Sequence, residues 1–175
     1  MRTALSAALF LLLVVATAPA EPVKVGAFTF MVPEGWKSVT PSSSMRKAQL
    51  EIAQGSDKAE VTFFQFGAGQ GGTVAENVAR WFAQFAGSED KRKTETVQAG
   101  SVKINYATTE GTFSSGMPGG PSTPMKDYAL CGAIVESPEG NVFIKMTGPV
   151  ALVKSSTEAF KKMVYEAAKN SAPRA

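Results

Sequence analysis

Alternating apolar and polar positions predict strands along most of the chain. The first predicted strand spans 27–32, where every second residue is apolar. The runs 47–53 and 59–66 flank a Gly-containing turn and predict a hairpin. Two more strands are predicted at 93–98 and 102–113, and another hairpin at 128–136 with 141–147. Hairpins connect antiparallel strands, so these runs indicate an antiparallel sheet.

Helical periodicity appears in two segments. Thr73 and Glu76 form a Thr-x-x-Glu capping box, which predicts a helix that ends at Gly87. Its predicted apolar stripe comprises Val74, Val78, Trp81, Phe82 and Phe85, and its wet face comprises Glu76, Asn77, Arg80 and Gln84. A second helix is predicted over 152–169, with an inner stripe of Val153, Ser156, Phe160, Met163, Val164 and Ala167. Each helix has one apolar stripe, so each is expected to pack on a sheet face in a single α+β domain over 21–175.

The first twenty residues have the pattern of a secretory signal peptide. Arg2 precedes an apolar run from Ala4 to Ala16, and Ala18-Pro19-Ala20 places small residues at a cleavage site. The alternative is an N-terminal membrane anchor, but the run is shorter than the about 20 apolar residues that span a bilayer. The pattern therefore predicts export to the periplasm or beyond, and no stable membrane insertion after cleavage.

The amino-acid composition excludes several kinds of catalytic and metal sites. The chain has no histidine and one cysteine, Cys131, which lies in a predicted strand and is expected to be buried. Serine–histidine and cysteine–histidine catalysis and histidine metal sites are therefore excluded. The net charge of +3 comes from scattered Lys and Arg residues, a distribution that does not indicate nucleic-acid binding. We expect a protein that is not an enzyme and has no cofactor.

Two loops and one aromatic side chain are the candidate interaction surface. The loop before the first helix matches the letters of a dinucleotide fingerprint, but it follows a hairpin strand, and Glu76 would repel an anion there. The second loop, 114–126, is rich in Gly, Pro and Ser, and Tyr128 follows it. The alternative for the first loop is a flexible connection between a strand and a helix, and the alternative for the second is a disordered loop. The candidate residues are Gly69, Gln70, Gly71, Gly72, Met117, Pro118 and Tyr128.

Several short motifs together resemble the PsbP-like superfamily. They are the opening strand into Pro33-Glu34-Gly35-Trp36, the helix after the second hairpin, and Thr147-Gly148-Pro149 before the last helix. That superfamily includes the extrinsic lumenal subunit of photosystem II, a Ran-binding nuclear import factor and many exported bacterial proteins, which this chain resembles most. The resemblance implies an α/β/α sandwich, with a central antiparallel sheet between helices, and a role in binding.

Two functions are compatible with these observations. The first is an exported, non-enzymatic binding or accessory module that contacts an envelope or secreted protein through its two Gly-rich loops. The alternative is a small-ligand carrier with a pocket between the sheet and a helix.

Overall fold

A computed structural model of the 175-residue chain describes residues 21–114 and 123–171. The predicted signal peptide, Met1–Ala20, lies outside the described residues, as do Met117 and Pro118. Neither of the two α-helices in the described part of the chain is long and apolar enough to cross a membrane.

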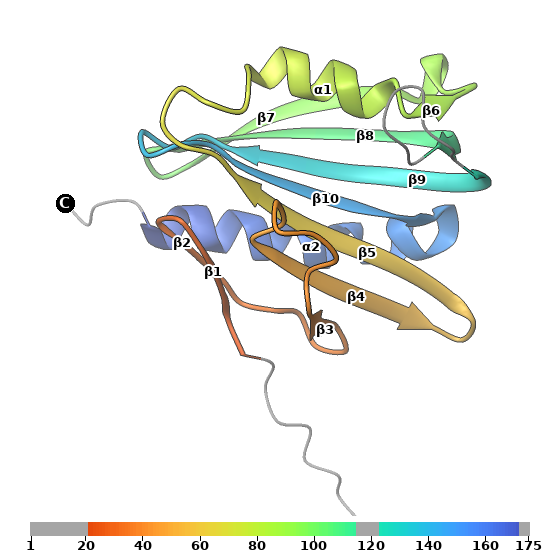
Figure 1. Ribbon diagram of the computed structural model, residues 1–175, viewed down its shortest axis with the longest axis horizontal. Helices are drawn as coiled ribbons and strands as arrows, with labels where there is room; N and C mark the ends of the chain where they lie inside the picture. Colours follow the sequence, from red (N-terminus) through yellow and green to blue (C-terminus); the bar gives the residue numbers. More distant parts are fainter. Residues whose placement is uncertain (1–20, 115–122, 172–175) are drawn as a thin grey trace, which may run out of the picture.

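The described strands form an antiparallel sheet of eight, in the order β3-β4-β5-β10-β9-β8-β6, with β7 also paired to β8 (Figure 1). Both predicted hairpins and the pair joined at 99–101 are present. The bounds are β3 (Lys37–Val39), β4 (Ala48–Gln54), β5 (Asp57–Gln65), β6 (Phe85–Ala86), β7 (Lys93–Ala99), β8 (Val102–Ser114), β9 (Pro124–Val135) and β10 (Val142–Pro149).

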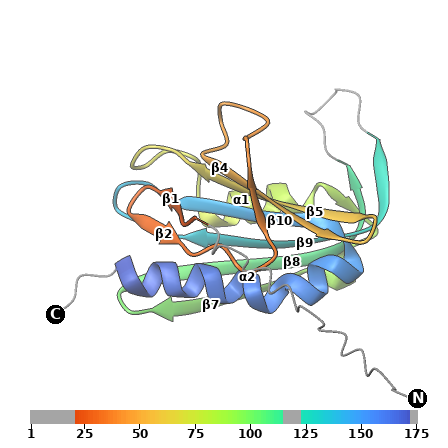
Figure 2. The same ribbon diagram turned by 90° about the horizontal axis from the view of Figure 1, so that it is seen from below.

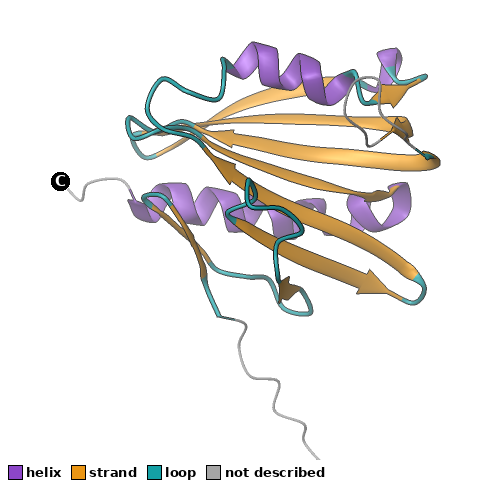
Figure 3. Cartoon of the chain, in the orientation of Figure 1, coloured by secondary structure: helices purple, strands orange, loops and turns teal. Residues whose placement is uncertain are grey.

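The predicted first strand is instead one arm of a small separate hairpin. Strands β1 (Val23–Val25) and β2 (Phe28–Phe30) pair with each other across Gly26, whose φ of 58° suits a tight turn. Phe28 and Phe30 are buried in the main core on the side of the last helix. In Figure 3 this hairpin lies beside that helix and outside the large sheet.

Helix α2 (Val150–Ser171) covers one face of the sheet, and α1 (Val74–Phe82) lies on the other (Figure 2). All six residues of the inner stripe predicted for the last helix are buried, which confirms that prediction. The five apolar ones pack with side chains of β4, β5, β8, β9 and β10 in one large apolar cluster. Alternate residues of β9, including Leu130 and Ile134, point to the opposite face and pack with Trp81 of α1. The layering is therefore the predicted sheet between helices.

The prediction for the first helix is wrong in two respects. The helix ends at Phe82, and Phe85 lies in β6, where it pairs with Phe113. Asn77 is buried, although it was assigned to the wet face. Its side-chain amide donates hydrogen bonds to the carbonyl oxygens of Gly71 (2.8 Å) and Thr73 (2.9 Å), so the polar group is satisfied by the loop that precedes the helix.

The second predicted loop is shorter than its composition suggests. Strand β8 continues to Ser114, and β9 begins at Pro124, four residues before the predicted start at Tyr128. Phe113 pairs with Met125 and Ser114 with Pro124, so tertiary pairing extends the hairpin into a Gly/Pro-rich region.

Candidate functional site

The face of the sheet that carries α1 is only partly covered by that helix. Within the described residues, α1 packs against β8, β9 and Phe143 of β10, and no helix lies over β4 and β5 on this face (Figure 1). A cavity of about 610 Å³ lies there. Its lining combines polar side chains from β4, β5, β10 and two connecting segments with apolar ones from β4, β5, β8 and β9. The lining residues are Arg46, Gln49, Leu50, Glu51, Lys58, Ala59, Glu60, Thr62, Phe64, Gln84, Phe113, Met125, Tyr128, Lys145 and Thr147.

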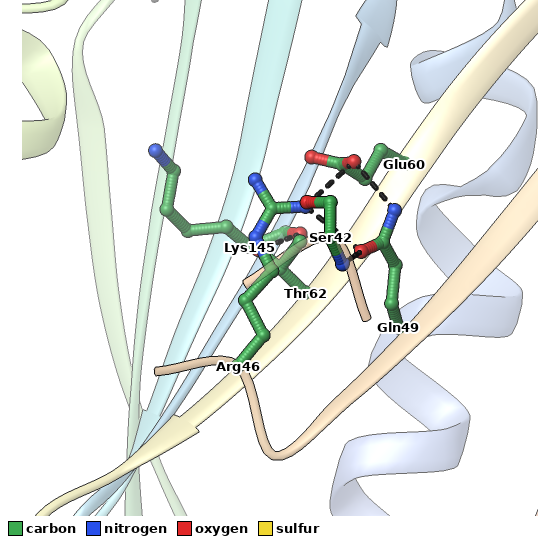
Figure 4. A network of polar contacts seen from close by, with 6 residues as sticks. All are labelled: Ser42, Arg46, Gln49, Glu60, Thr62 and Lys145. Atoms are coloured by element: carbon green, nitrogen blue, oxygen red, sulfur yellow. Dashed lines mark hydrogen bonds and ion pairs between the residues drawn. The ribbon is translucent and has the colours of Figure 1, made fainter. Parts of the chain in front are cut away.

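A hydrogen-bonded network forms one wall of this cavity (Figure 4). Nη1 of Arg46 donates to Oε2 of Glu60 at 2.8 Å and to Oε1 of Gln49 at 2.9 Å. Nε2 of Gln49 donates to the same Glu60 oxygen at 2.7 Å, and the backbone N–H of Ser42 donates to Gln49 at 3.0 Å. The network fastens the segment before β4 onto β4 and β5. The Arg46–Glu60 pair is partly solvated, so its main effect is to position the segment.

Lys145 of β10 lies deeper in the same cavity. Its Nζ donates to Oε1 of Gln84 at 2.6 Å and lies 5.9 Å from the centre of the Phe113 ring. Burial lowers the pKa of Lys145 from 10.5 to about 8, against the opposing charge of Glu60 and with a further lowering by Arg46. Among the described residues, no carboxylate lies within ion-pair distance of this ammonium group. The amine is therefore held by a neutral amide and an aromatic ring.

An aromatic wall stands opposite the polar network. The Phe113 and Tyr128 rings are stacked, with centroids 6.0 Å apart and planes at 5°, and Phe85 packs against Phe113 at 4.9 Å. Met125 and Tyr128 both line the cavity although they are three residues apart, a spacing that simple alternation would place on opposite faces. A bulge at Asp127, whose φ is 55°, changes the alternation between them.

The charged groups of the cavity do not balance. Glu60 is paired with Arg46, and Glu51 is paired with Lys58 at 3.2 Å. Lys145 is the third cation and leaves an excess of one positive charge when it is protonated.

The predicted glycine loop lies elsewhere, between β5 and α1. Gly69, Gln70 and Gly72 border a separate cavity of about 350 Å³. Gly71 has a φ of 87° and lies against the Phe66 and Phe143 rings, where a Cβ would be 2.7 Å and 3.1 Å from ring atoms. The loop thus needs glycine for its backbone conformation and for close packing.

The carboxylate of Glu76 faces this glycine loop. It accepts hydrogen bonds from the backbone N–H of Thr73 at 2.7 Å and from its hydroxyl at 2.9 Å. These bonds hold the pKa of Glu76 below its usual value, so the group is ionised and closes the capping box. A negative charge at this helix start opposes a phosphate there, in agreement with the argument from sequence against a dinucleotide.

Of the predicted site residues that the structure describes, only Tyr128 lines the main cavity, while Gly69, Gln70 and Gly72 border a different one. Sequence reasoning missed Arg46, Glu60 and Lys145. Lys145 had a detectable signal, since it is the one charged residue in the apolar strand 142–149 and alternation places it opposite Ile144.

Two further kinds of site were considered from the sequence, a reactive cysteine and a metal site. Cys131 is fully buried, and burial raises the pKa of its thiol to about 12. Residues 21–114 and 123–171 contain no group of three His, Cys, Asp or Glu side chains that could hold a metal ion.

No protein-family model matches the chain, and a search of curated proteins finds none similar to it. Among solved structures, the chain is similar to the solution structure of cyanobacterial PsbP (CyanoP) from Synechocystis sp. PCC 6803. The two share 11% sequence identity, and the match covers 89% of this chain and 95% of the other with a TM-score of 0.47. The strands and helices of the structure confirm the α+β fold expected from the sequence, and the similar solved structure bears the superfamily name noted there. The likeness concerns the fold alone and carries no argument about ligands or partners.

Proposed function

We propose that this protein is an exported, non-enzymatic binding module, and that the cavity over β4, β5 and β10 is its binding site. The observation that supports this most is the combination, in one cavity of about 610 Å³, of a fixed polar network, a stacked aromatic pair and an amine that forms no ion pair with any described carboxylate. Convergent polar groups beside apolar walls are typical of binding sites.

The composition favours binding over catalysis. The chain has no histidine, and its cysteine is buried with a raised thiol pKa. Export rests on the signal-peptide pattern of residues 1–20. Sequencing the amino terminus of the protein recovered from outside the cytoplasm tests this part; a chain that begins at Glu21 supports it, and retention of Met1 contradicts it.

We propose an envelope or secreted protein as the partner. The test replaces Tyr128, at the cavity wall, with the photo-reactive residue benzoylphenylalanine in the native host. The matched control carries the same residue at Tyr165, a half-buried tyrosine on α2. A crosslinked protein obtained from position 128 and not from position 165 supports the proposal. Equal products from both positions, or none from position 128, contradict it.

A small-ligand carrier is the second candidate, and the volume of the cavity favours it. About 610 Å³ lies within the range of about 300–1,000 Å³ found for small-molecule sites. Native mass spectrometry of protein purified from its own host distinguishes the two candidates. A constant added mass that Tyr128→Ala abolishes supports a carrier, whereas an unliganded protein that still crosslinks through position 128 supports a protein partner.

A further inference from the structure

We infer that the cavity recognises an organic carboxylate carried on an apolar body, with the Lys145 ammonium as its charge partner and the Phe113–Tyr128 stack as the surface for the apolar part. This inference rests on the proposed binding function and names the chemistry of its ligand.

The electrostatics of the site point to a single negative charge. Two of the three cations in the cavity already have carboxylate partners, and only Lys145 lacks one among the described residues. Glu60 faces the same space, so a dianion such as phosphate would be repelled by it. A monoanion balances the excess charge without bringing in a second negative charge.

Side chains of the described residues use one of the three donors of the Lys145 ammonium group. An ammonium group has three donors, and the structure gives one hydrogen bond, to Oε1 of Gln84 at 2.6 Å. The Phe113 ring lies at 5.9 Å from Nζ, and the Lys145 side chain is half-buried. A ligand carboxylate would accept from the remaining donors and restore the interactions lost on burial.

The aromatic side chains of the cavity indicate the nature of the ligand group that carries the carboxylate. The Lys145 Nζ lies 5.9 Å from the Phe113 ring, Phe113 is stacked on Tyr128, and Met125 lines the same cavity. Phe113 is already buried, whereas Tyr128 and Met125 are half-buried, so an apolar or aromatic body placed against them would bury further apolar surface. The ligand is therefore an amphipathic monoacid, supplied either as a free small acid or as an acidic side chain beside an apolar one in a peptide.

The binding test uses the mature protein, with amide chemical shifts followed by NMR. The probes are 3-phenylpropionate, its neutral analogue 3-phenylpropionamide, and the blocked peptide acetyl-Phe-Glu-amide. We expect the acid or the peptide to shift resonances around Lys145 and Tyr128, and the amide to bind about 10- to 100-fold more weakly than the acid. Binding of the free acid alone indicates a small ligand, and binding of the peptide alone indicates a peptide; both results support the inference.

Three variants test whether Lys145 is the cation that binds the carboxylate of the ligand. Lys145→Met should weaken binding of the acid about 10- to 100-fold, and Lys145→Arg should retain most of it, because the guanidinium keeps the charge. Lys103→Met removes the same charge at a site outside the cavity, where Lys103 pairs with Glu136, and should leave binding unchanged. The amide spectra also show whether each variant is folded.

The pH profile provides a second readout. A bound carboxylate raises the pKa of Lys145 above about 8, so affinity should be constant below that pH and fall by up to about tenfold per unit above it, with uptake of a proton on binding. Lys145→Arg should remove this dependence. The other titratable or charged groups facing the amine come from the segment before β4, from β4, β5 and β9; they are Arg46, Glu51, Lys58, Glu60 and Tyr128.

Three results would overturn the inference: no binding of any probe up to its solubility limit, equal affinity for the acid and its amide, or an unchanged affinity in Lys145→Met. The broader proposal is tested separately by the crosslink from position 128. A crosslink that persists in Lys145→Met would remove the carboxylate inference and leave the binding function in place.

Discussion

The two faces of the sheet differ in how completely a helix covers them. Under α2, the 22 residues of the helix bury a continuous apolar surface contributed by β4, β5, β8, β9 and β10. Opposite it, the nine residues of α1 reach only part of the sheet, and the cavity beside the helix is lined by polar as well as apolar side chains of β4, β5 and β10. The difference indicates that the α2 face supplies most of the stability and that the other face retains room for binding.

Strand β10 shows the contrast within one element. Val142, Ile144 and Met146 point to the α2 side and are fully buried. Lys145 and Thr147 point to the open side and line the cavity. Neighbouring residues thus belong to different environments, and substitutions in each environment should have different consequences.

The largest effect is expected under α2. Phe160 is fully buried between the helix and the sheet, so Phe160→Ala should lower the free energy of unfolding by about 3–5 kcal/mol through lost burial and a cavity. Chemical denaturation measures this. Lys162→Ala, at an exposed position of the same helix, should change stability by less than about 0.5 kcal/mol. Equal effects would contradict the assignment of this face as the core.

A smaller effect is expected where α1 contacts the sheet. The six-membered part of the Trp81 ring lies directly on Gly132, where a Cβ would overlap it. Gly132→Ala should therefore cost about 1–3 kcal/mol by forcing the helix away. In Gly132→Ala with Trp81→Phe, the smaller ring relieves the overlap, so the double variant should lose less than the sum of the two single losses. Strict additivity would show that the contact does not constrain α1.

The start of α1 should contribute less again. Thr73→Ala removes the side-chain acceptor for the backbone N–H of Glu76 and should cost about 1 kcal/mol in the free energy of unfolding. Thr73→Ser keeps the hydroxyl and should restore most of this loss. If alanine and serine behaved alike, the capping box would not determine the stability of the helix start.

The smallest effect at neutral pH is expected inside the cavity. Lys145→Met removes the hydrogen bond to Gln84 but also removes a buried ammonium group, so the free energy of unfolding should change by less than about 1 kcal/mol at pH 7.

The pH dependence of the stability of Lys145→Met separates the lost hydrogen bond from the removal of the buried charge. Between pH 8 and 10.5 the unfolded chain keeps the Lys145 proton and the folded protein releases it, so the stability of the native protein should rise relative to Lys145→Met. The thiol of Cys131 acts in the opposite sense above its ordinary pKa of 9.0, because burial keeps it protonated in the fold. Both proteins contain Cys131, so its contribution cancels in the difference. A difference that stays constant over this range would contradict a lowered pKa for Lys145.

Features that depend on contacts within one helix or strand were predicted correctly from the sequence, whereas features that depend on contacts between distant segments were not. The capping box at Thr73 and the inner stripe from Val153 to Ala167 were predicted correctly, because they depend on hydrogen bonds and periodicity within one element. Phe85 was assigned to the helix because its spacing continues the stripe, but pairing with Phe113 places it in β6. Asn77 is polar and buried because a neighbouring loop satisfies its amide, which periodicity cannot indicate.

The site was predictable only in part for the same reason. Tyr128 was identified as an aromatic residue next to an irregular segment, and it does line the cavity. The pairing of Arg46 with Glu60 joins residues from two segments and depends on the register between β4 and β5. Met125 joins Tyr128 on one face only because the bulge at Asp127 changes the alternation.

The sequence by itself determined the antiparallel hairpins, the two amphipathic helices and the absence of histidine chemistry, since these follow from local periodicity and composition. Only the tertiary structure decided which part of the sheet remains open. That outcome depends on the short length of α1 and on where Trp81 meets Gly132. It leaves Lys145 beside an amide and an aromatic ring, and the chemistry of the amine follows from that placement.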